Sequence, residues 1–520
     1  MDDEVPVGML AAAGGGGDSE PGQSQNDRAD PVSRRIHRAF GRTLPPSVVR
    51  ELRRAVGGAF STRLEDRICY SYDATDIRAV PDAVAWPSTT DEVAALVRAA
   101  VGYGLPVVPR GAGTGYTGGS IPVSGGVVLS TEKMDRIISV DVGRRIAVVQ
   151  PGVVNNRLRE EVELLGLYYP PDPASLLVST IGGNIAEGAG GPRTVLHGTT
   201  RDYVVGLELV MPDGSVVSTG ILSSEDGESW DASQLMVASE GTLSITTRAA
   251  LRLSERPLGF ATFWAEFPSL ESAAAAVSRI TAIGLPVAVM EILDRETFAS
   301  ASEYITGARP EAPPEGALLV ELEGNADTVA TGTERLRDEL VSLGAGVFRE
   351  ATEEEERERI WEMRRAISPS LARISTGKIN EDIAVPRSAI PAFVRLMNEV
   401  SEDVRLPILA FGHAGDGNLH VNIMVDRNDR LQMESAREAV SRMFTAALSL
   451  GGTLSGEHGI GITKADHLAD ELDPVGLAVT ASVKRAMDPA ALLNPEKILT
   501  DRPNPWWAVE HPPGEGGQRC

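Results

Sequence analysis

The sequence predicts an α+β fold built from two unequal parts, and three observations support this prediction. Two glycine-rich stretches, at 109–119 and 179–191, lie between apolar segments in the first half of the chain. A hairpin signal follows, in which Asp213-Gly214 suits a two-residue turn. After Pro257 the apolar segments follow the order β-α-β-β-α-β, which is the order of a split ferredoxin-like unit with an antiparallel sheet.

Length and charge limit the classes of function. The chain has 520 residues, enough for two or three domains, and a net charge of −24, which argues against nucleic-acid and anionic-membrane partners. No apolar run reaches the ~20 residues of a membrane span, and the start MDDEV lacks the basic segment of a secretory signal. The two cysteines, Cys69 and Cys520, exclude a disulfide framework. We therefore expect a cytoplasmic protein.

Composition also predicts the domain boundaries. Residues 1–45 read as a disordered acidic tail rich in Gly, Asp, Ser and Gln. A first domain at 46–256 and a second at 257–499 follow, separated by the change in pattern near Pro257. Residues 500–520 are rich in Pro and Gly and are expected to form a flexible tail.

The first domain is predicted to begin with helices and a strand that lead into the first glycine-rich stretch. The apolar spacing over 48–56 predicts an amphipathic helix. A capping box at Thr89–Glu92 begins a second helix, which is expected to stop at Gly104. A strand at 106–108 then runs into the stretch PRGAGTGYTGG at 109–119.

That stretch has the chemistry of a phosphate cradle. Six of its eleven residues are Gly or Ala, so successive N–H groups can turn toward one anion. Thr114 and Thr117 add hydroxyl donors and Arg110 adds a cation. The alternative is a glycine-rich surface turn. The spacing matches neither a P-loop nor a Rossmann fingerprint.

The remaining apolar segments are assigned by their period. The first domain is completed by a strand at 146–150, a helix at 153–165, the hairpin strands at 204–211 and 216–219, and a turn at 239–243. In the second domain we expect strands at 261–267, 287–293, 318–323, 346–349, 408–411 and 419–425, and helices at 270–283, 327–343, 353–375 and 432–450.

Two further stretches, FGHAGDGNLHVNI and SGEHGIG, embed acids and imidazoles among glycines. His413 and His420 are seven residues apart, and the intervening Gly-Asp-Gly must bend the chain if both imidazoles are to converge. With Glu457 they would form a two-imidazole, one-carboxylate metal set with open positions, leaving His458 as a base. The alternative is a pair of unrelated histidines on a loop.

Seven motifs in this order resemble one family. They are similar to motifs of the FAD-linked oxidases of the vanillyl-alcohol oxidase type. The seven motifs are PRGAGTGYTGG, STIGGNIAEGAGG, TRDYVVGLELVMPDG, SEGTL, FGHAGDGNLHVNI, SGEHGIG and NPEKIL. The most similar branch holds the flavin subunit of glycolate oxidase, D-lactate dehydrogenases and D-2-hydroxyglutarate dehydrogenase. Over about 45–500 the resemblance implies a PCMH-type FAD-binding domain of two subdomains and a substrate cap followed by a C-terminal FAD-contacting segment.

The resemblance implies an FAD site made of small and polar residues. The pyrophosphate would contact Arg110, Gly111, Ala112, Gly113, Thr114, Gly115, Thr117 and Gly118. The flavin and ribityl would contact Pro171, Asp172, Ser175, Thr180, Gly183, Asn184, Gly188, Ala189 and Gly190, while Glu240 and Ile245 would flank the adenine half and Asn494 would close the site. Residues 105–120 contain no histidine for a covalent flavin link, so dissociable FAD is expected. His197 stands where relatives have Tyr, and we expect it to pack beside the flavin rather than to catalyse.

The resemblance also implies the roles of the catalytic residues. His413, His420 and Glu457 would bind Zn²⁺ or a similar divalent ion, His413 and His420 thereby contacting the substrate as well, and His458 would be the base. Arg364 would bind the substrate carboxylate together with Lys378, or with Asn380 in its place.

The function expected from this resemblance is FAD-dependent oxidation of a D-2-hydroxy acid to the 2-oxo acid, with hydride transfer to flavin N5. The alternatives are the flavin subunit of a multi-subunit complex, a non-redox relative such as an ether-lipid synthase, and a flavin-free metallohydrolase. The electron acceptor would be oxygen, a quinone, a cytochrome, an electron-transfer flavoprotein or a separate iron–sulfur subunit, since the chain has no cluster-binding cysteines.

Overall fold

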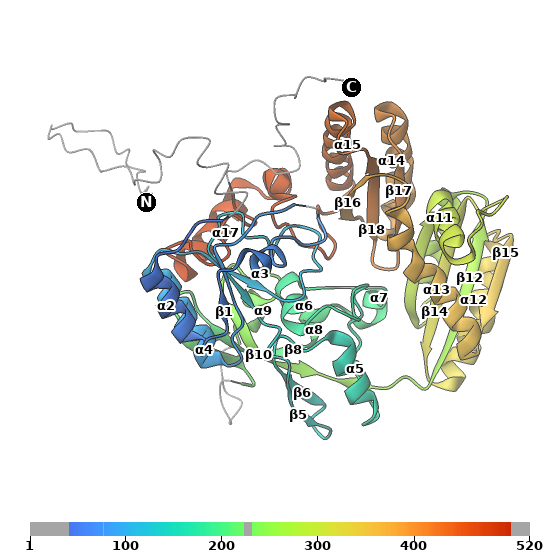
Figure 1. Ribbon diagram of the computed structural model, residues 1–520. Helices are drawn as coiled ribbons and strands as arrows, with labels where there is room; N and C mark the ends of the chain where they lie inside the picture. Colours follow the sequence, from blue (N-terminus) through green and yellow to red (C-terminus); the bar gives the residue numbers. More distant parts are fainter. Residues whose placement is uncertain (1–40, 76, 223–230, 501–520) are drawn as a thin grey trace, which may run out of the picture.

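The computed structural model of this protein describes residues 41–75, 77–222 and 231–500 (Figure 1). The predicted tails at 1–45 and 500–520 lie outside these ranges except for 41–45 and residue 500. No helix within the described ranges is long and apolar enough to cross a membrane.

A small four-stranded sheet carries the first glycine-rich loop. Its order is β1-β2-β4-β3, and β2, β4 and β3 are parallel. The strands are Phe60–Ser61, Ala83–Ala85, Val107–Arg110 (β3) and Val127–Ser130 (β4). Helices α2 (Pro46–Ala55), α3 (Leu64–Ile68) and α4 (Thr90–Gly102) accompany it. The Thr89 side chain accepts from Glu92 N at 3.2 Å, which gives α4 its predicted N-terminal cap.

An antiparallel five-stranded sheet forms the second layer, in the order β5-β6-β10-β8-β9. Its strands are Ile137–Asp141, Ile146–Val149, Val204–Val210 (β8), Val216–Gly220 (β9) and Ile245–Arg252. The predicted hairpin is β8–β9, but the connection spans 211–215 and is longer than the two-residue turn expected. Asp213 Oδ1 accepts from Ser215 N at 2.8 Å, so an Asx turn extends the loop beyond Asp213-Gly214.

Short elements around this sheet position the second glycine-rich stretch. They are α5 (Asn155–Glu163), β7 (Leu167–Tyr168), α6 (Ile181–Glu187), α7 (Thr194–His197), α8 (Thr200–Tyr203), α9 (Ser233–Met236) and β11 (Ser254–Glu255). The 179–191 stretch therefore contains the helix α6, and Gly188, with a φ of +66°, is the C-cap that follows it.

The C-terminal part is one antiparallel seven-stranded sheet, in the order β15-β12-β14-β13-β17-β18-β16. Its strands are β12 (Gly259–Phe267), β13 (Val287–Asp294), β14 (Gly316–Gly324), β15 (Val347–Ala351), β16 (Gly377–Ala384), β17 (Ile408–His413) and β18 (Asn418–Val425). The predicted β-α-β-β-α-β unit comprises β12 to β15. Strands β17, β18 and β16 extend that unit into a larger sheet, and β16 was not predicted.

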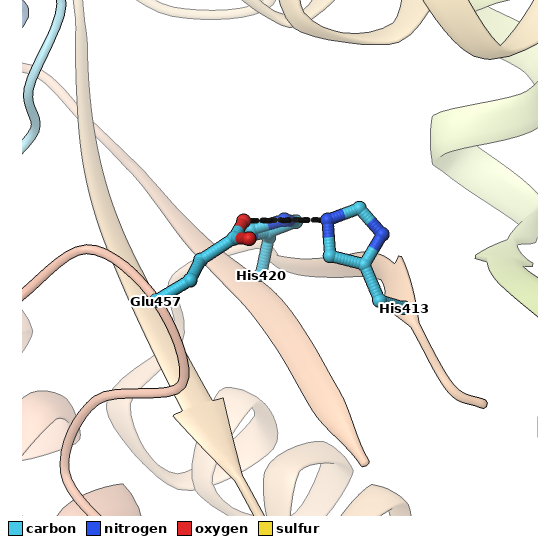
Figure 2. Close-up of side chains that lie close together, drawn as sticks. All are labelled: His413, His420 and Glu457. Carbon is cyan, nitrogen blue, oxygen red and sulfur yellow. Dashed lines mark hydrogen bonds and ion pairs between the residues drawn. The ribbon is translucent and has the colours of Figure 1, made fainter. Parts of the chain in front are cut away.

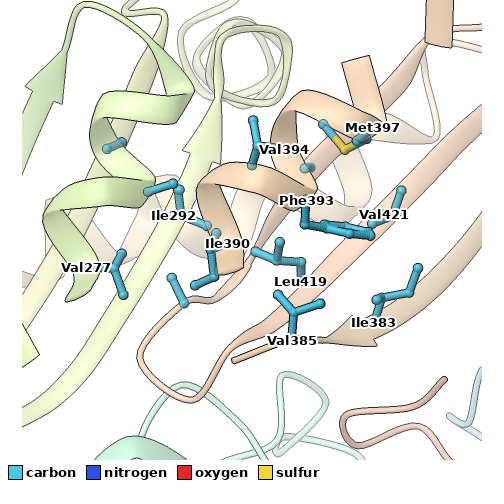
Figure 3. Close-up of a cluster of buried hydrophobic side chains, with 14 of the residues drawn as sticks. Val277, Ile292, Ile383, Val385, Ile390, Phe393, Val394, Met397, Leu419 and Val421 are labelled. Atoms are coloured by element: carbon cyan, nitrogen blue, oxygen red, sulfur yellow. The ribbon is translucent and has the colours of Figure 1, made fainter. Parts of the chain in front are cut away.

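Helices cover the two faces of this sheet differently. One face packs against α10 (Leu270–Ala282), α12 (Ala326–Ser342), α14 (Ile390–Val404) and α15 (Arg430–Ser449) in a large apolar core, part of which Figure 3 shows. The other face packs against α11 (Arg295–Thr306) and α13 (Glu354–Leu371). Side chains alternate between faces along a strand. The same strand can therefore direct polar side chains toward α13 and apolar side chains into the core on the other face.

The last segment of the chain returns to the first layer. After η3 (Ala465–His467), α16 (Leu468–Glu471) and α17 (Pro474–Met487), Val107 N donates to Leu492 O at 2.8 Å and Asn494 N donates to Val107 O at 2.8 Å. Ile462 N donates to Thr117 O at 2.7 Å, beside the first glycine-rich loop. The two parts of the chain therefore meet at the glycine-rich loops.

Candidate active site

A cavity of about 520 Å³ lies where the two parts meet. Both glycine-rich stretches and the segment around Glu240 line one side of it. Side chains of the seven-stranded sheet and of α13 line the other, among them Arg364, Lys378 and Phe411. This is the α13 side of the sheet, where polar residues replace the apolar side chains of the opposite face.

The first loop shows why glycine is needed here. Gly113 has a φ of +71°, and a Cβ there would collide with the guanidinium of Arg110. That guanidinium is buried beneath the loop and donates from Nη1 to Tyr72 O at 2.7 Å and to Ser120 Oγ at 3.1 Å. Arg110 thus supports the loop and places a positive charge at the cavity wall.

The structure places most of the predicted cofactor residues at this cavity. Those that line it are Arg110, Gly111, Ala112, Gly113, Thr114, Gly115, Ser175, Thr180, Gly183, Asn184, Ala189, Gly190, Glu240 and Ile245. Thr117, Gly118, Pro171, Asp172, Gly188 and Asn494 are not among the lining residues. Asn494 instead joins two lining segments, because its Nδ2 donates to Gly119 O at 2.9 Å and to Glu240 O at 2.8 Å.

The lining has the polar groups that a large polar cofactor requires. Ser179 Oγ, Thr180 Oγ1, Asn184 Nδ2 and Glu187 Oε2 are buried and have no hydrogen-bond partner among the described residues. Buried polar atoms are rarely left unpaired. Their concentration at one cavity indicates a site built for a ligand that hydrogen-bonds to them.

Sequence reasoning missed several lining residues, including Asp73, Tyr116, Glu187, Met236 and Ser368. Tyr116 and Glu187 belong to stretches that were singled out, so the motifs themselves could have indicated them. Asp73 precedes the first glycine-rich loop by more than thirty residues and has no sequence signal of its own.

His413, His420 and Glu457 form a compact cluster (Figure 2). One ligand atom from each lies within 4.8 Å of the others. His413 Nε2 is 3.3 Å from Glu457 Oε1 and 3.4 Å from His420 Nε2, and His420 Nε2 is 3.5 Å from Glu457 Oε1. The histidines converge because the hairpin at 414–417 folds β18 back along β17, with Phe411 opposite His420.

Burial and pairing give the members of this cluster different charges. Burial raises the pKa of Glu457, but His413 and His420 outweigh it and lower the pKa to about 2. Burial lowers the pKa of His413, but Glu291 and Glu457 raise it well above its usual range. Burial and the neighbouring His413 hold the pKa of His420 well below its usual range. Two imidazoles and one carboxylate at these separations are a donor set that zinc prefers, so the residues fit a divalent ion.

His458 lies beside this cluster in a stack of rings. Its imidazole stacks on His420 at 5.1 Å and on Tyr116 at 5.0 Å between ring centroids. Its Nε2 is 3.9 Å from Glu457 Oε1 and its Nδ1 is 3.4 Å from Asp382 Oδ1. Burial lowers the pKa of His458 against the opposing field of Asp382, and a neutral imidazole can accept a proton.

Asp382 on β16 holds the loop that carries Glu457 and His458. Its Oδ2 accepts from Glu457 N at 2.6 Å and from His458 N at 2.8 Å, and its Oδ1 pairs with the buried Lys464. Burial raises the pKa of Asp382, but His458 and Lys464 outweigh it and hold the pKa well below the usual range. Asp382 is therefore a charged anchor.

Cationic side chains lie at the same end of the cavity. Arg364 on α13 pairs with Glu291, and its guanidinium lies 5.0 Å from the centroid of the Phe411 ring. Lys378 Nζ lies 5.7 Å from the centroid of Tyr116. Asn380 also lines the cavity and donates to Asn422 Oδ1 at 2.7 Å. An anion in the cavity would meet these groups.

His197 lies apart from the cavity lining. Its Nε2 is 3.0 Å from Glu323 Oε1, and its ring packs edge-on against Tyr168. This arrangement places His197 in a packed, ion-paired cluster between the two parts of the chain.

Comparison with known proteins gives matches over most of the chain. Residues 259–498 match the family "FAD linked oxidases, C-terminal domain", and residues 81–220 match "FAD binding domain". The chain is 39% identical to the glycolate oxidase subunit GlcD of Bacillus subtilis, covering 83% of this chain and 92% of that protein. It is 34% identical to GlcD of Escherichia coli strain K12 over 87% and 91%, and 33% identical to the D-lactate dehydrogenase of Archaeoglobus fulgidus over 83% and 95%.

Solved structures share the fold. A p-cresol methylhydroxylase structure matches with a TM-score of 0.73 at 17% identity, covering 87% of this chain and 96% of that one. The 4-ethylphenol oxidase of Gulosibacter chungangensis matches with a TM-score of 0.71 at 19% identity, over 87% and 96%. These matches confirm the α+β fold class and the PCMH-type arrangement of an FAD-binding domain followed by a C-terminal domain.

Proposed function

Because the chain belongs to the FAD-linked oxidase family and is an FAD-linked oxidoreductase, we propose that it oxidises a D-2-hydroxy acid to the 2-oxo acid. The substrate class is that of glycolate, D-lactate or D-2-hydroxyglutarate. The observation that carries the proposal is the single cavity that joins the glycine-rich loops to Arg364, His420, Glu457 and His458.

The two ends of this cavity supply complementary chemistry. The glycine-rich end, with its unpaired buried hydroxyl and amide groups, would hold FAD, and bound FAD supplies the acceptor for the hydride from Cα. His413 Nε2, His420 Nε2 and Glu457 Oε1 would hold a divalent ion, for which we propose Zn²⁺. Such an ion supplies a Lewis acid that stabilises developing negative charge on the substrate hydroxyl oxygen.

The chain's own residues then orient the acid and take its proton. Arg364 would bind the substrate carboxylate through its guanidinium, with Lys378 or Asn380 as the second contact. His458 would accept the hydroxyl proton at Nε2, because its Nδ1 faces Asp382. Tyr116 and His420 hold the imidazole between them. The reaction balances as one proton to His458 and one hydride to the flavin.

The test is anaerobic mixing of purified protein with D- and L-2-hydroxy acids while the flavin absorbance is followed. Bleaching by a D-acid is expected. His458→Ala should keep its flavin and lose about 10²–10⁴-fold in the rate of reduction, whereas His413→Ala should also lose bound metal. His467→Ala is the matched control, because His467 pairs with Asp470 on the periphery. Full activity in both site variants would contradict the assignment.

A second candidate function is the flavin subunit of a multi-subunit complex, favoured by the relatives named glycolate oxidase subunit. In that case an acid would bleach the flavin, but an artificial acceptor would restore its colour faster than oxygen does. We propose that the physiological acceptor is a separate partner, such as an iron–sulfur subunit, a quinone or an electron-transfer flavoprotein.

Two further features complete the proposal. FAD would be dissociable, so acid precipitation should release the flavin into the supernatant. The protein would work in the cytoplasm, in line with its acidic charge and its use of only two cysteines. A synthase reaction without net oxidation is disfavoured by the His413, His420 and Glu457 cluster, since such a reaction has no need of a Lewis acid at a hydroxyl.

A further inference from the structure

Glu291 lies on β13 and contacts two of the groups named above. Its Oε1 accepts from His413 Nδ1, and its Oε2 accepts from Arg364 Nε. Glu291 is 0% exposed. The three residues come from β13, β17 and α13, and Glu291 is the register partner of His413 across the sheet.

The first contact decides which nitrogen of His413 is free. A carboxylate at Nδ1 keeps a proton on that nitrogen, so Nε2 is the nitrogen that gives up its proton and offers its lone pair when a metal ion binds. That nitrogen is the one that lies 3.3 Å from Glu457 Oε1 and 3.4 Å from His420 Nε2. Glu291 therefore turns His413 into a ligand directed at the other two.

The second contact decides which edge of Arg364 is free. With Nε bonded to Glu291 and the guanidinium lying over Phe411, the two Nη groups remain for a ligand in the cavity that Arg364 lines. Arg364 Nη2 is buried and has no hydrogen-bond partner in the described part of the chain. A buried, unpaired guanidinium N–H is a donor directed at an anion.

We propose that Glu291 is a positioning residue that fixes His413 and Arg364 against each other, so that the metal-ligand and carboxylate-binding sites bind the two neighbouring groups of one 2-hydroxy acid. This inference rests on the proposed function. One carboxylate serves both sites, so the spacing between the ion and the guanidinium is set by a single side chain. Metal binding and acid binding must then fail together when Glu291 changes.

Glu291→Gln tests this proposal because glutamine has the shape of glutamate but different hydrogen-bonding groups. The glutamine side chain has one carbonyl oxygen and one NH₂ group. Whichever way the amide faces, its NH₂ meets an N–H donor of either His413 or Arg364. The variant keeps the shape of the side chain but loses one of the two contacts. The contact that remains is made to an uncharged carbonyl oxygen instead of a carboxylate.

The experiment uses the FAD-loaded protein. Zinc affinity is measured by equilibrium dialysis in a zinc buffer, and affinity for oxalate is measured from the shift in the flavin spectrum. We expect Glu291→Gln to bind zinc about 10–100-fold more weakly and oxalate at least about tenfold more weakly. FAD content and the unfolding temperature are followed to check the fold.

Glu323→Gln is the matched control. Glu323 is a buried carboxylate on the neighbouring strand β14, and it pairs with Arg193 and His197 rather than with the site. It should lose stability but keep both affinities. If Glu291→Gln does not retain FAD, Glu291→Asp keeps the charge, and its shorter side chain should still weaken both affinities.

Each result is decisive. Joint loss of zinc and oxalate affinity in the Glu291 variant, beyond any change in Glu323→Gln, supports the inference. If the wild type and the Glu291 variant bind both ligands equally well, this inference is overturned but the proposed function is not. Loss of one affinity without the other also overturns this inference. A wild type that binds neither zinc nor oxalate overturns the proposed function, and this inference with it.

Discussion

Arg193 of the FAD-binding domain donates from Nη2 to Glu321 Oε1 of the C-terminal domain at 2.5 Å, and neither side chain is more than 8% exposed. Glu321 also accepts from Arg357 Nε at 2.8 Å and from Trp361 Nε1 at 3.0 Å. Burial raises the pKa of Glu321, but Arg193 and Arg357 outweigh it and lower the pKa to about 2. Arg357, Trp361 and Arg364 all belong to α13, so this network ties α13 to the FAD-binding domain.

Arg193→Met should be strongly destabilising. The change leaves the carboxylates of Asp172, Glu321 and Glu323 without their shared cation in a buried site. Breaking a buried pair by removing one partner costs about 3–5 kcal/mol. Urea unfolding followed by circular dichroism measures this change. Arg337→Met, which breaks an exposed pair with Glu350, is the control and should unfold near the wild-type midpoint. Equal midpoints for the two variants would contradict the role of Arg193.

Asp382→Asn should slow catalysis as well as destabilise the fold, because it also leaves the buried Lys464 without its carboxylate partner. Asp382 accepts from the backbone N–H groups of Glu457 and His458, so it sets the position of a metal-ligand candidate and of the proposed base. An asparagine can keep one acceptor but places an NH₂ group against these donors or against Lys464. We expect flavin reduction by the substrate acid to slow about 10–100-fold, as for other residues that support metal ligands. Stopped-flow absorbance measures the rate, and an unchanged rate would remove Asp382 from the site.

Gly459→Ala should weaken FAD binding. Gly459 has a φ of +83°, and a Cβ there would lie 2.7 Å from both Glu187 Oε2 and Glu240 Oε1. Glu240 anchors the same loop by accepting from Ile460 N at 2.7 Å. The strained backbone and the collision together cost about 1–3 kcal/mol.

Titration of the apoprotein with FAD, followed by flavin fluorescence, measures the effect of this substitution. Gly166→Ala is the matched control, because Gly166 has a φ of +73° but an added Cβ would meet nothing within 4 Å. Equal FAD affinities in the two alanine variants would show that the loop around Gly459 does not shape the cofactor site.

The expected convergence of His413, His420 and Glu457 is found in the structure, and it could be predicted because the three residues lie within two short stretches. His413 and His420 are joined by one hairpin, so their convergence needs only that the glycines between them turn. The strand β16 was missed for a physical reason. Lys378, Asn380 and Asp382 face the site and alternate with Ile379 and Ile383 of the core, but Glu381 places a carboxylate at the core-facing position between the two isoleucines. This interrupts the alternation of apolar and polar residues that reveals a half-buried strand.

Long-range pairs could not be predicted in the same way. Glu291 and Glu321 interrupt apolar strands, and nothing local indicates their partners. Glu291 bonds to residues 73 and 122 positions away, and Glu321 bonds to Arg193, 128 positions away. Such pairs depend on the order of strands in the sheet and on the placement of α13, which the apolar pattern does not specify.

Glu381 should make stability depend on pH. It lies on β16 between Ile379 and Ile383, which belong to the core beneath α14 and α15. It is 0% exposed, and neither of its carboxylate oxygens has a hydrogen-bond partner in the described ranges. Burial raises the pKa of Glu381 to about 8, against the opposing field of Lys464. The folded protein therefore holds a proton that the unfolded chain releases near pH ~4.3.

Because the folded-state pKa is the higher one, the contribution of Glu381 is fully present below pH ~4.3 and is lost as the pH rises through about 8. Over this window the free energy of unfolding should fall by about 1.4 kcal/mol per pH unit from this group. Glu381→Gln cannot ionise, so the difference in unfolding free energy between variant and wild type should grow in favour of the variant from pH 5 to pH 8. Urea unfolding at several pH values gives this difference. A difference that stays constant across the window would mean that the Glu381 carboxyl is already ionised in the folded protein, and that it has found a partner beneath α14 and α15.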